Sequence, residues 1–137
     1  LDYKKIKKLM RGKFIFDRAY KLKRQYDELL KEALMSNKRG KIVRFLYSNE
    51  KWSFTADLAN ELMHNYPGKV IIVGREKNNE IRMSLRSPEN GIILPNVVNR
   101  ALNGLEGYGG GHDHASGASV KKEDFEEFVR RIEKEIK

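Results

Sequence analysis

The sequence contains no cysteine, only three prolines and a single tryptophan in 137 residues. Without cysteine the chain forms no disulfide, thiolate zinc site, iron–sulfur cluster or cysteine nucleophile. No apolar run approaches the roughly 20 residues that a membrane-spanning helix needs, and no signal-peptide pattern opens the chain. We therefore expect no membrane partner. The lack of cysteine also fits a reducing, cytoplasmic location, which we expect for this protein.

Acidic residues are scarce in the N-terminal part of the chain, residues 1–52. The formal net charge is +9, but residues 1–52 hold 16 Lys and Arg against 6 Asp and Glu, whereas residues 53–137 hold 12 against 13. Such asymmetry favours an acidic partner, nucleic acid first, although a solvated helix face accounts for the same charge. The first residue is Leu1 rather than Met, so we expect the sequence to be part of a longer chain.

Hydrophobic periodicity predicts a long helix at the N-terminus, over residues 1–36. Gly12 lies between two apolar runs, where we expect a break or kink, and Asp17 is a candidate cap for the second run. The polar stretch that ends at Gly40 predicts the end of the helix.

After residue 40 the spacing of the apolar residues changes, and segments with strand-like spacing alternate with segments with helical spacing. Asn78 and Asn79 predict a hairpin turn because asparagine tolerates positive φ, and Thr55 is a candidate helix cap. We expect strands over residues 42–47, 70–73, 81–86 and 118–120, helices over residues 55–63, 95–102 and 124–137, and a glycine-rich loop from Gly104 to Gly117. The predicted fold class is α/β, a small mixed β-sheet flanked by helices and preceded by a basic N-terminal helical linker.

The most distinctive segment is the run Gly109-Gly110-Gly111-His112. Consecutive glycine N–H groups in a loop can converge on an anion, and a following histidine can donate to the same oxyanion. A flexible surface loop is the open alternative. No Lys-Ser or Lys-Thr pair follows the glycines, which argues against a Walker loop. His112 and His114 would suit a metal only with a third ligand, which the sequence does not identify.

A second candidate is the alternating segment of Arg82, Ser84 and Arg86, whose side chains share one face of the predicted strand. An arginine fork beside a hydroxyl suits a phosphate or carboxylate. A solvated polar face is the alternative. The sequence shows no recognisable acid–base pair, Ser–His–Asp set or carboxylate-rich metal site. We therefore expect no catalytic residue and a binding module that is inactive by itself.

Taken in order, these segments resemble a known family. Val70–Val73, then Met83-Ser84-Leu85-Arg86-Ser87, then a helix and the run GGGHDHASG of residues 109–117 are similar to the C-terminal, DHH-associated domain of DHH phosphoesterases. That superfamily includes RecJ-type single-strand exonucleases, oligoribonucleases and cyclic-dinucleotide phosphodiesterases. The resemblance covers about residues 41–137, and the form GGGHDHASGA is most similar to archaeal RecJ-like members.

The resemblance implies a substrate-binding domain at 41–137 and, at 1–40, a basic helical linker with the end of a catalytic lobe. In such families that lobe holds two Mn ions, so Mn belongs to the missing lobe and no cofactor or metal is expected in this chain. The implied phosphate-binding residues are Ser84, Arg86, Ser87, Gly109, Gly110, Gly111 and His112.

The implied function is phosphate binding for a Mn-dependent hydrolase, a RecJ-like exonuclease or an oligoribonuclease. Its partners would be single-stranded DNA or RNA or a short oligonucleotide, the DHH catalytic lobe, and replication or repair proteins. One alternative is a non-catalytic scaffold module of a replication assembly. Another is a tRNA-binding domain related to the C-terminal domain of alanyl-tRNA synthetase.

Overall fold

The computed structural model describes residues 2–36, 38, 40–49, 51–89 and 91–136. The chain forms two compact units, residues 1–35 and residues 36–137. In the part of the chain that is described, no helix is both long enough and apolar enough to cross a membrane.

The first unit is a single helix, α1 (Tyr3–Met35), which continues without a break through Gly12 and Asp17. The predicted break is wrong, because one glycine inside a helix costs only about 1 kcal/mol relative to alanine. Asp17 is not a cap. Asp2 caps the helix instead, since its Oδ1 accepts a hydrogen bond from the backbone N–H of Lys4 at 3.0 Å.

The second unit is built on a five-stranded mixed sheet in the order β1-β2-β3-β5-β4. Its strands are β1 (Ile42–Ser48), β2 (Val70–Lys77), β3 (Glu80–Arg86), β4 (Gly107–His112) and β5 (Ala115–Lys121). Among the described strands only β1 and β2 pair in parallel, and α2 (Thr55–Asn65) makes the crossover that a parallel pair requires. The remaining helices are α3 (Leu94–Ala101), a short 3-10 turn (Lys122–Asp124) and α4 (Phe125–Glu135). The predicted α/β class is confirmed.

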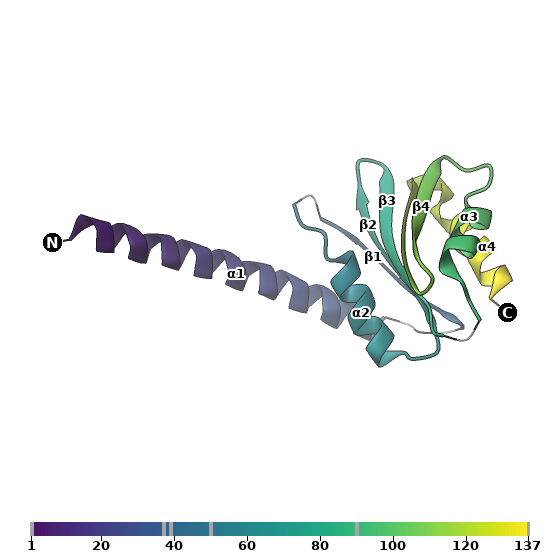
Figure 1. Cartoon of the computed structure of the whole chain (residues 1–137), viewed down its shortest axis with the longest axis horizontal. Helices are drawn as coiled ribbons and strands as arrows, with labels where there is room; N and C mark the ends of the chain where they lie inside the picture. The colour runs from purple at the N-terminus through teal and green to yellow at the C-terminus, as the bar shows by residue number, and fades with distance from the viewer. Residues whose placement is uncertain (1, 37, 39, 50, 90, 137) are drawn as a thin grey trace. The chain divides into compact units, whose positions relative to one another are not determined.

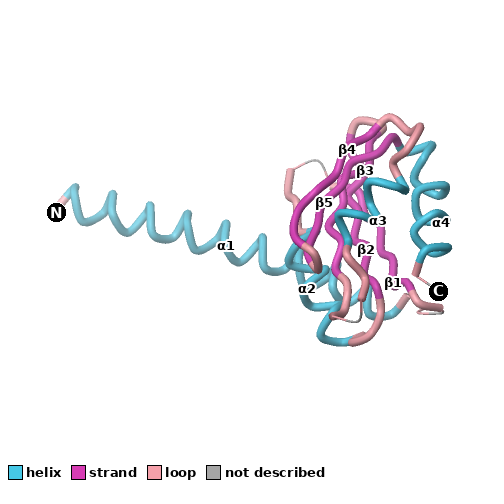
Figure 2. Tube along the Cα trace, turned by 45° about the vertical axis from the view of Figure 1, so that its right-hand side comes forward, coloured by secondary structure: helices cyan, strands magenta, loops and turns pink. Residues whose placement is uncertain are grey.

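Helices cover both faces of the sheet (Figures 1 and 2). Helix α2 contacts β2 and β3 on one face and buries Leu58 and Leu62 there. Helices α3 and α4 pack on the opposite face, where a hydrophobic cluster includes Leu85, Val98 and Phe128. Each large apolar side chain buried in this way contributes about 1.5–3 kcal/mol.

The hairpin between β2 and β3 has the predicted turn. Asn78 and Asn79 have φ angles of 53° and 63°, and Lys77 pairs with Glu80 across the turn. Two consecutive positive φ angles give a turn whose twist matches that of the flanking strands. In β3 the apolar side chains alternate with Arg82, Ser84 and Arg86 in the burial pattern, as predicted.

Two local predictions are wrong. The segment predicted as a loop, residues 104–117, contains the whole of β4 and the start of β5, so the glycines lie in an edge strand. Thr55 is the first residue of α2 and caps nothing with its side chain; its Oγ1 accepts a hydrogen bond from Ser84 Oγ at 2.9 Å. The predicted C-terminal helix is α4, and its expected end at residue 137 lies outside the described residues.

Candidate phosphate-binding site

A groove of about 810 Å³ lies where α2 meets the ends of β3, β4 and β5. We call it the Arg86 groove. Its lining residues are Asn60, Met63, Arg86, Ser87, Pro88, Glu89, Gly111, His112, Asp113, His114 and Ala115. It therefore brings together Arg86, Ser87, Gly111 and His112 of the predicted site. Ser84, Gly109 and Gly110 are not among its lining residues.

Strand register explains why Arg86 and His112 line the same groove although they are 26 positions apart in the sequence. Arg86 lies opposite Ala115 in the β3–β5 pair, and Ala115 lies opposite His112 in the β4–β5 pair. Directly opposed residues of a sheet project from the same face. Arg86 and His112 thus share the face that α2 partly covers, with only the small Ala115 side chain between them.

The Arg86 side chain is held in place but keeps donors to offer. Its Nε donates to Asn60 Oδ1 at 2.8 Å, and its Nη1 donates to the Leu85 carbonyl at 2.9 Å. A guanidinium has five N–H donors, so three remain. Among the described residues no carboxylate pairs with Arg86 within 4.0 Å. Partial burial lowers the pKa of Arg86 from its usual value, yet an arginine stays charged at neutral pH.

The two predicted serines each have a protein partner. Ser84 Oγ donates to Thr55 on α2, as described above. Ser87 is buried, its Oγ lies 3.0 Å from His114 Nδ1, and its backbone N–H donates to the His114 carbonyl at 3.1 Å. These contacts fix the end of β3 to the β4–β5 turn and so hold one wall of the Arg86 groove. A phosphate-binding role for either hydroxyl stays a prediction.

The three glycines do not form a loop with converging N–H groups. They lie in β4, where successive backbone N–H groups point to opposite sides of the strand. A Cβ on Gly109 would stand 2.6 Å from Val98 Cγ1 of α3, so this glycine allows the strand to approach the helix. Gly111 has a φ of +139°, which favours glycine. Of these three glycines, Gly110 is the one at which an added Cβ would meet no atom within 4 Å.

His112 is exposed, and its carbonyl accepts a hydrogen bond from Ser116 Oγ at 2.9 Å, which anchors the backbone beneath the imidazole. Two carboxylates, Glu89 and Asp113, also line the Arg86 groove. An anion bound there relies on the Arg86 guanidinium and gains no general positive field from its surroundings.

Sequence reasoning missed Asn60, which holds the Arg86 guanidinium. A lone asparagine on an amphipathic helix carries no motif, and only the packing of α2 on β3 brings it to Arg86. Among the described residues no group of three or more His, Asp or Glu side chains is arranged to hold a metal ion. His112 and His114 are not part of such a group.

Residues 38–137 match the DHHA1 domain family, so the chain belongs to that family, as the sequence motifs predicted. No curated protein matches the chain. Solved structures with a similar fold include RecJ from Thermus thermophilus in complex with Mn²⁺, with a TM-score of 0.68 and 17% identity over 90% of this chain. The chain spans 18% of that RecJ.

Two further structures share the fold. The C-Ala domain of alanyl-tRNA synthetase from Aquifex aeolicus has a TM-score of 0.56 and 18% identity, over 72% of this chain and 94% of that one. The pGpG-specific phosphodiesterase PggH from Vibrio cholerae has a TM-score of 0.58 and 14% identity, over 88% of this chain and 42% of that one. At these identities the likeness concerns the fold.

Proposed function

We propose that this DHHA1 domain binds phosphate groups of nucleotides or single-stranded nucleic acid in the Arg86 groove. The observation that carries the proposal is the state of Arg86: oriented by Asn60, left with three N–H donors, and set on the same face as His112. A planar guanidinium fork with parallel donors matches two oxygens of a phosphate. His112 adds a donor from β4, which is separated from β3 by β5.

The wider proposal concerns a longer protein. The domain grips the substrate of a Mn-dependent DHH phosphodiesterase, a RecJ-like exonuclease or an oligoribonuclease, whose catalytic lobe lies outside this chain. The likeness to a Mn²⁺-bound RecJ and to a pGpG-specific phosphodiesterase supports this. The proposed partners are short single strands, the catalytic lobe and replication or repair proteins, in the cytoplasm.

A second candidate function follows from the likeness to the C-Ala domain of an alanyl-tRNA synthetase, nearly all of which this chain covers. In that case the ligand would be a folded RNA. A titration that compares tRNA with an unstructured single strand of equal charge separates the two. Tighter binding of tRNA would favour the second candidate function, whereas equal or tighter binding of the single strand would favour the first. Binding of neither, together with capture of a protein partner, would favour a scaffold module.

The test of the main proposal is a calorimetric titration with a 5′-phosphorylated dinucleotide. Arg86→Ala and His112→Ala should each weaken binding, by about 10- to 150-fold for a lost charge-assisted hydrogen bond. Neither side chain belongs to the hydrophobic core, so both variants should melt close to the wild-type chain. Leu85→Ala is the contrasting variant, because Leu85 is fully buried and its truncation costs about 2–5 kcal/mol. Wild-type affinity in Arg86→Ala would contradict the assignment.

A further inference from the structure

A second cationic hollow lies on the same face of the sheet, beside the β2–β3 hairpin. We call it the hairpin hollow. It has a volume of about 140 Å³ and is lined by Arg75, Lys77, Asn78, Glu80 and Arg82. Three cations and one carboxylate give these side chains a formal net charge of +2. The lining of the hairpin hollow is thus more positive than that of the Arg86 groove, where two carboxylates accompany one arginine.

Arg82 is the cation in this hollow that is best placed to receive a ligand. Its side chain is 71% exposed, and its Nε lies 3.9 Å from Glu80 Oε2. An exposed ion pair at that separation is weak. A phosphate can therefore bind Arg82 without breaking a strong contact.

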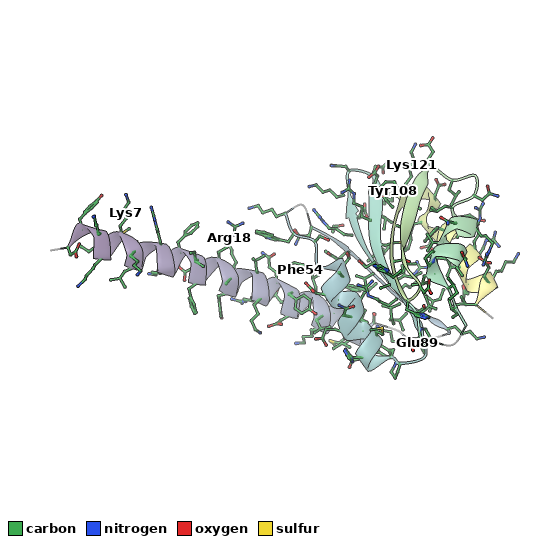
Figure 3. All side chains as sticks on the ribbon, in the orientation of Figure 1. Lys7, Arg18, Phe54, Glu89, Tyr108 and Lys121 are labelled. Carbon is green, nitrogen blue, oxygen red and sulfur yellow. The ribbon has the colours of Figure 1, made fainter. Side chains whose placement is uncertain are left out.

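The Arg86 groove and the hairpin hollow lie at a definite spacing along β3. Arg82 and Arg86 lie on β3 and project from the same face, four residues apart, which corresponds to about 13 Å at ~3.3 Å per residue. In Figure 3, Glu89 of the Arg86 groove and Tyr108 lie toward opposite ends of the sheet. A stacked strand advances about 3.4 Å per nucleotide, so the interval corresponds to about four nucleotides.

Tyr108 supplies a surface for a base at the far end. Arg82 lies opposite Ser119, and Ser119 lies opposite Tyr108, so Tyr108 shares a face and a cross-strand row with Arg82. Tyr108 is 64% exposed. Exposed aromatic rings beside cations are platforms on which nucleic-acid bases stack without sequence preference.

We propose that the hairpin hollow and Tyr108 form a second contact region for a single strand whose phosphate occupies the Arg86 groove. The preferred ligand is then an oligonucleotide of about four nucleotides or more, rather than a mononucleotide. This inference rests on the proposed function, because it extends the same strand from the Arg86 groove along the sheet.

The experiment compares two thymidine ligands of different length, a 5′-phosphorylated dinucleotide and a hexanucleotide, in calorimetric titrations of the 137-residue chain. Arg82→Ala should weaken binding of the hexanucleotide by about 2- to 10-fold and leave binding of the dinucleotide unchanged. It should also reduce the log–log salt slope for the hexanucleotide by about 0.7. The matched control is Arg100→Ala on α3, an arginine 61% exposed and paired with Glu135, which should change neither ligand.

A second pair of variants tests the stacking. Tyr108→Ala should weaken binding of the hexanucleotide but not of an abasic phosphodiester strand of equal length, whereas Tyr108→Phe should retain binding of both. Equal effects of Tyr108→Ala on the two strands would contradict base stacking. Equal effects of Arg82→Ala on both ligand lengths, or no effect on either, would overturn the second contact region.

Failure of the proposed function gives a different result. If Arg86→Ala leaves binding of the dinucleotide unchanged, the Arg86 groove is not the phosphate site, whatever Arg82→Ala does. If Arg86→Ala weakens both ligands and wild-type affinity is the same for both lengths, the proposed function stands and the second contact region is wrong.

Discussion

Gly109, Gly110 and Gly111 differ in what each allows the chain to do, although they are chemically identical. Gly109 permits the close approach of β4 to Val98, Gly111 adopts a backbone conformation that favours glycine, and Gly110 faces open space. The run therefore serves the geometry of the edge strand first. Of the three, only Gly111 lines the Arg86 groove.

Alanine substitutions should separate these roles in stability. Gly109→Ala places a Cβ 2.6 Å from Val98 Cγ1 and 2.9 Å from the Gly117 carbonyl, and overpacking of this kind costs about 1–3 kcal/mol. Gly110→Ala is the matched control, and it should alter the free energy of unfolding by no more than about 0.5 kcal/mol. Urea denaturation of the two variants measures the difference, and equal stabilities would refute the packing role of Gly109.

Asn60 acts on a ligand only through Arg86, so it is a positioning residue. Asn60→Ala removes the acceptor of the Arg86 Nε hydrogen bond, and we expect phosphate affinity to fall by about 2- to 10-fold, less than in Arg86→Ala. Asn65→Ala is the control on the same helix, because its amide donates to the Glu61 carbonyl, away from the site. In the background of Arg86→Ala, Asn60→Ala should have no further effect; an additive loss would contradict the positioning role.

At the scale of the element, Arg131 of α4 ties that helix to the C-terminal end of α3. Arg131 Nη1 donates to the carbonyls of Ala101 and Asn103 at 3.0 and 2.7 Å, where the carbonyl groups at the end of α3 lack helical partners. Glu127 accepts from Arg131 Nε at 2.9 Å and also pairs with Arg130. These hydrogen bonds, to Arg130 first and then Arg131, lower the pKa of the Glu127 carboxyl to about 2.

A lowered carboxyl pKa makes the contribution of Glu127 depend on pH. Its folded-state pKa is below that of the unfolded chain, so its stabilisation is present above about pH 4.3 and is lost as pH falls toward about 2. Glu127→Gln should therefore unfold at a lower temperature than wild type at pH 7 and at nearly the same temperature at pH 2. Thermal melts across this range test the pair, and a difference that persists at pH 2 would contradict it.

At the scale of the whole molecule, a Mn-dependent phosphodiesterase needs ligands that hold the ion beside the scissile phosphate. Added Mn²⁺ should produce no phosphodiester hydrolysis by this chain, because the described residues offer no group of three metal-ligating side chains to activate water or stabilise the developing charge. The measurement is release of mononucleotide from a labelled short single strand. Hydrolysis that required Mn²⁺ and disappeared in both His112→Ala and His114→Ala would show a metal site that the fold does not reveal.

Local patterns in the sequence were sufficient for much of the fold. The alternation around Leu85, the continuous apolar run Val70–Val73 and the Asn78-Asn79 turn each specify a strand or turn through side-chain spacing and backbone preference. They also placed Arg86 on the polar face of its strand. That Arg86 and His112 belong to one site was predicted from family motifs, since no local rule connects the two.

Tertiary structure alone decided the rest. Glycine-rich segments have little preference for the extended form, so β4 exists because β5 pairs with it and α3 packs closely behind it. At Gly12 and Asp17 the local sequence predicted a break that the helix does not have. The free-energy effect of a single helix breaker or capping residue is too small to interrupt a long helix. Asn60 reaches Arg86 only after α2 has packed on β3. Sequence spacing determined which side chains share a face within one helix or strand. The candidate site also required contacts between elements. The free energy of those contacts depends on packing that no single segment encodes.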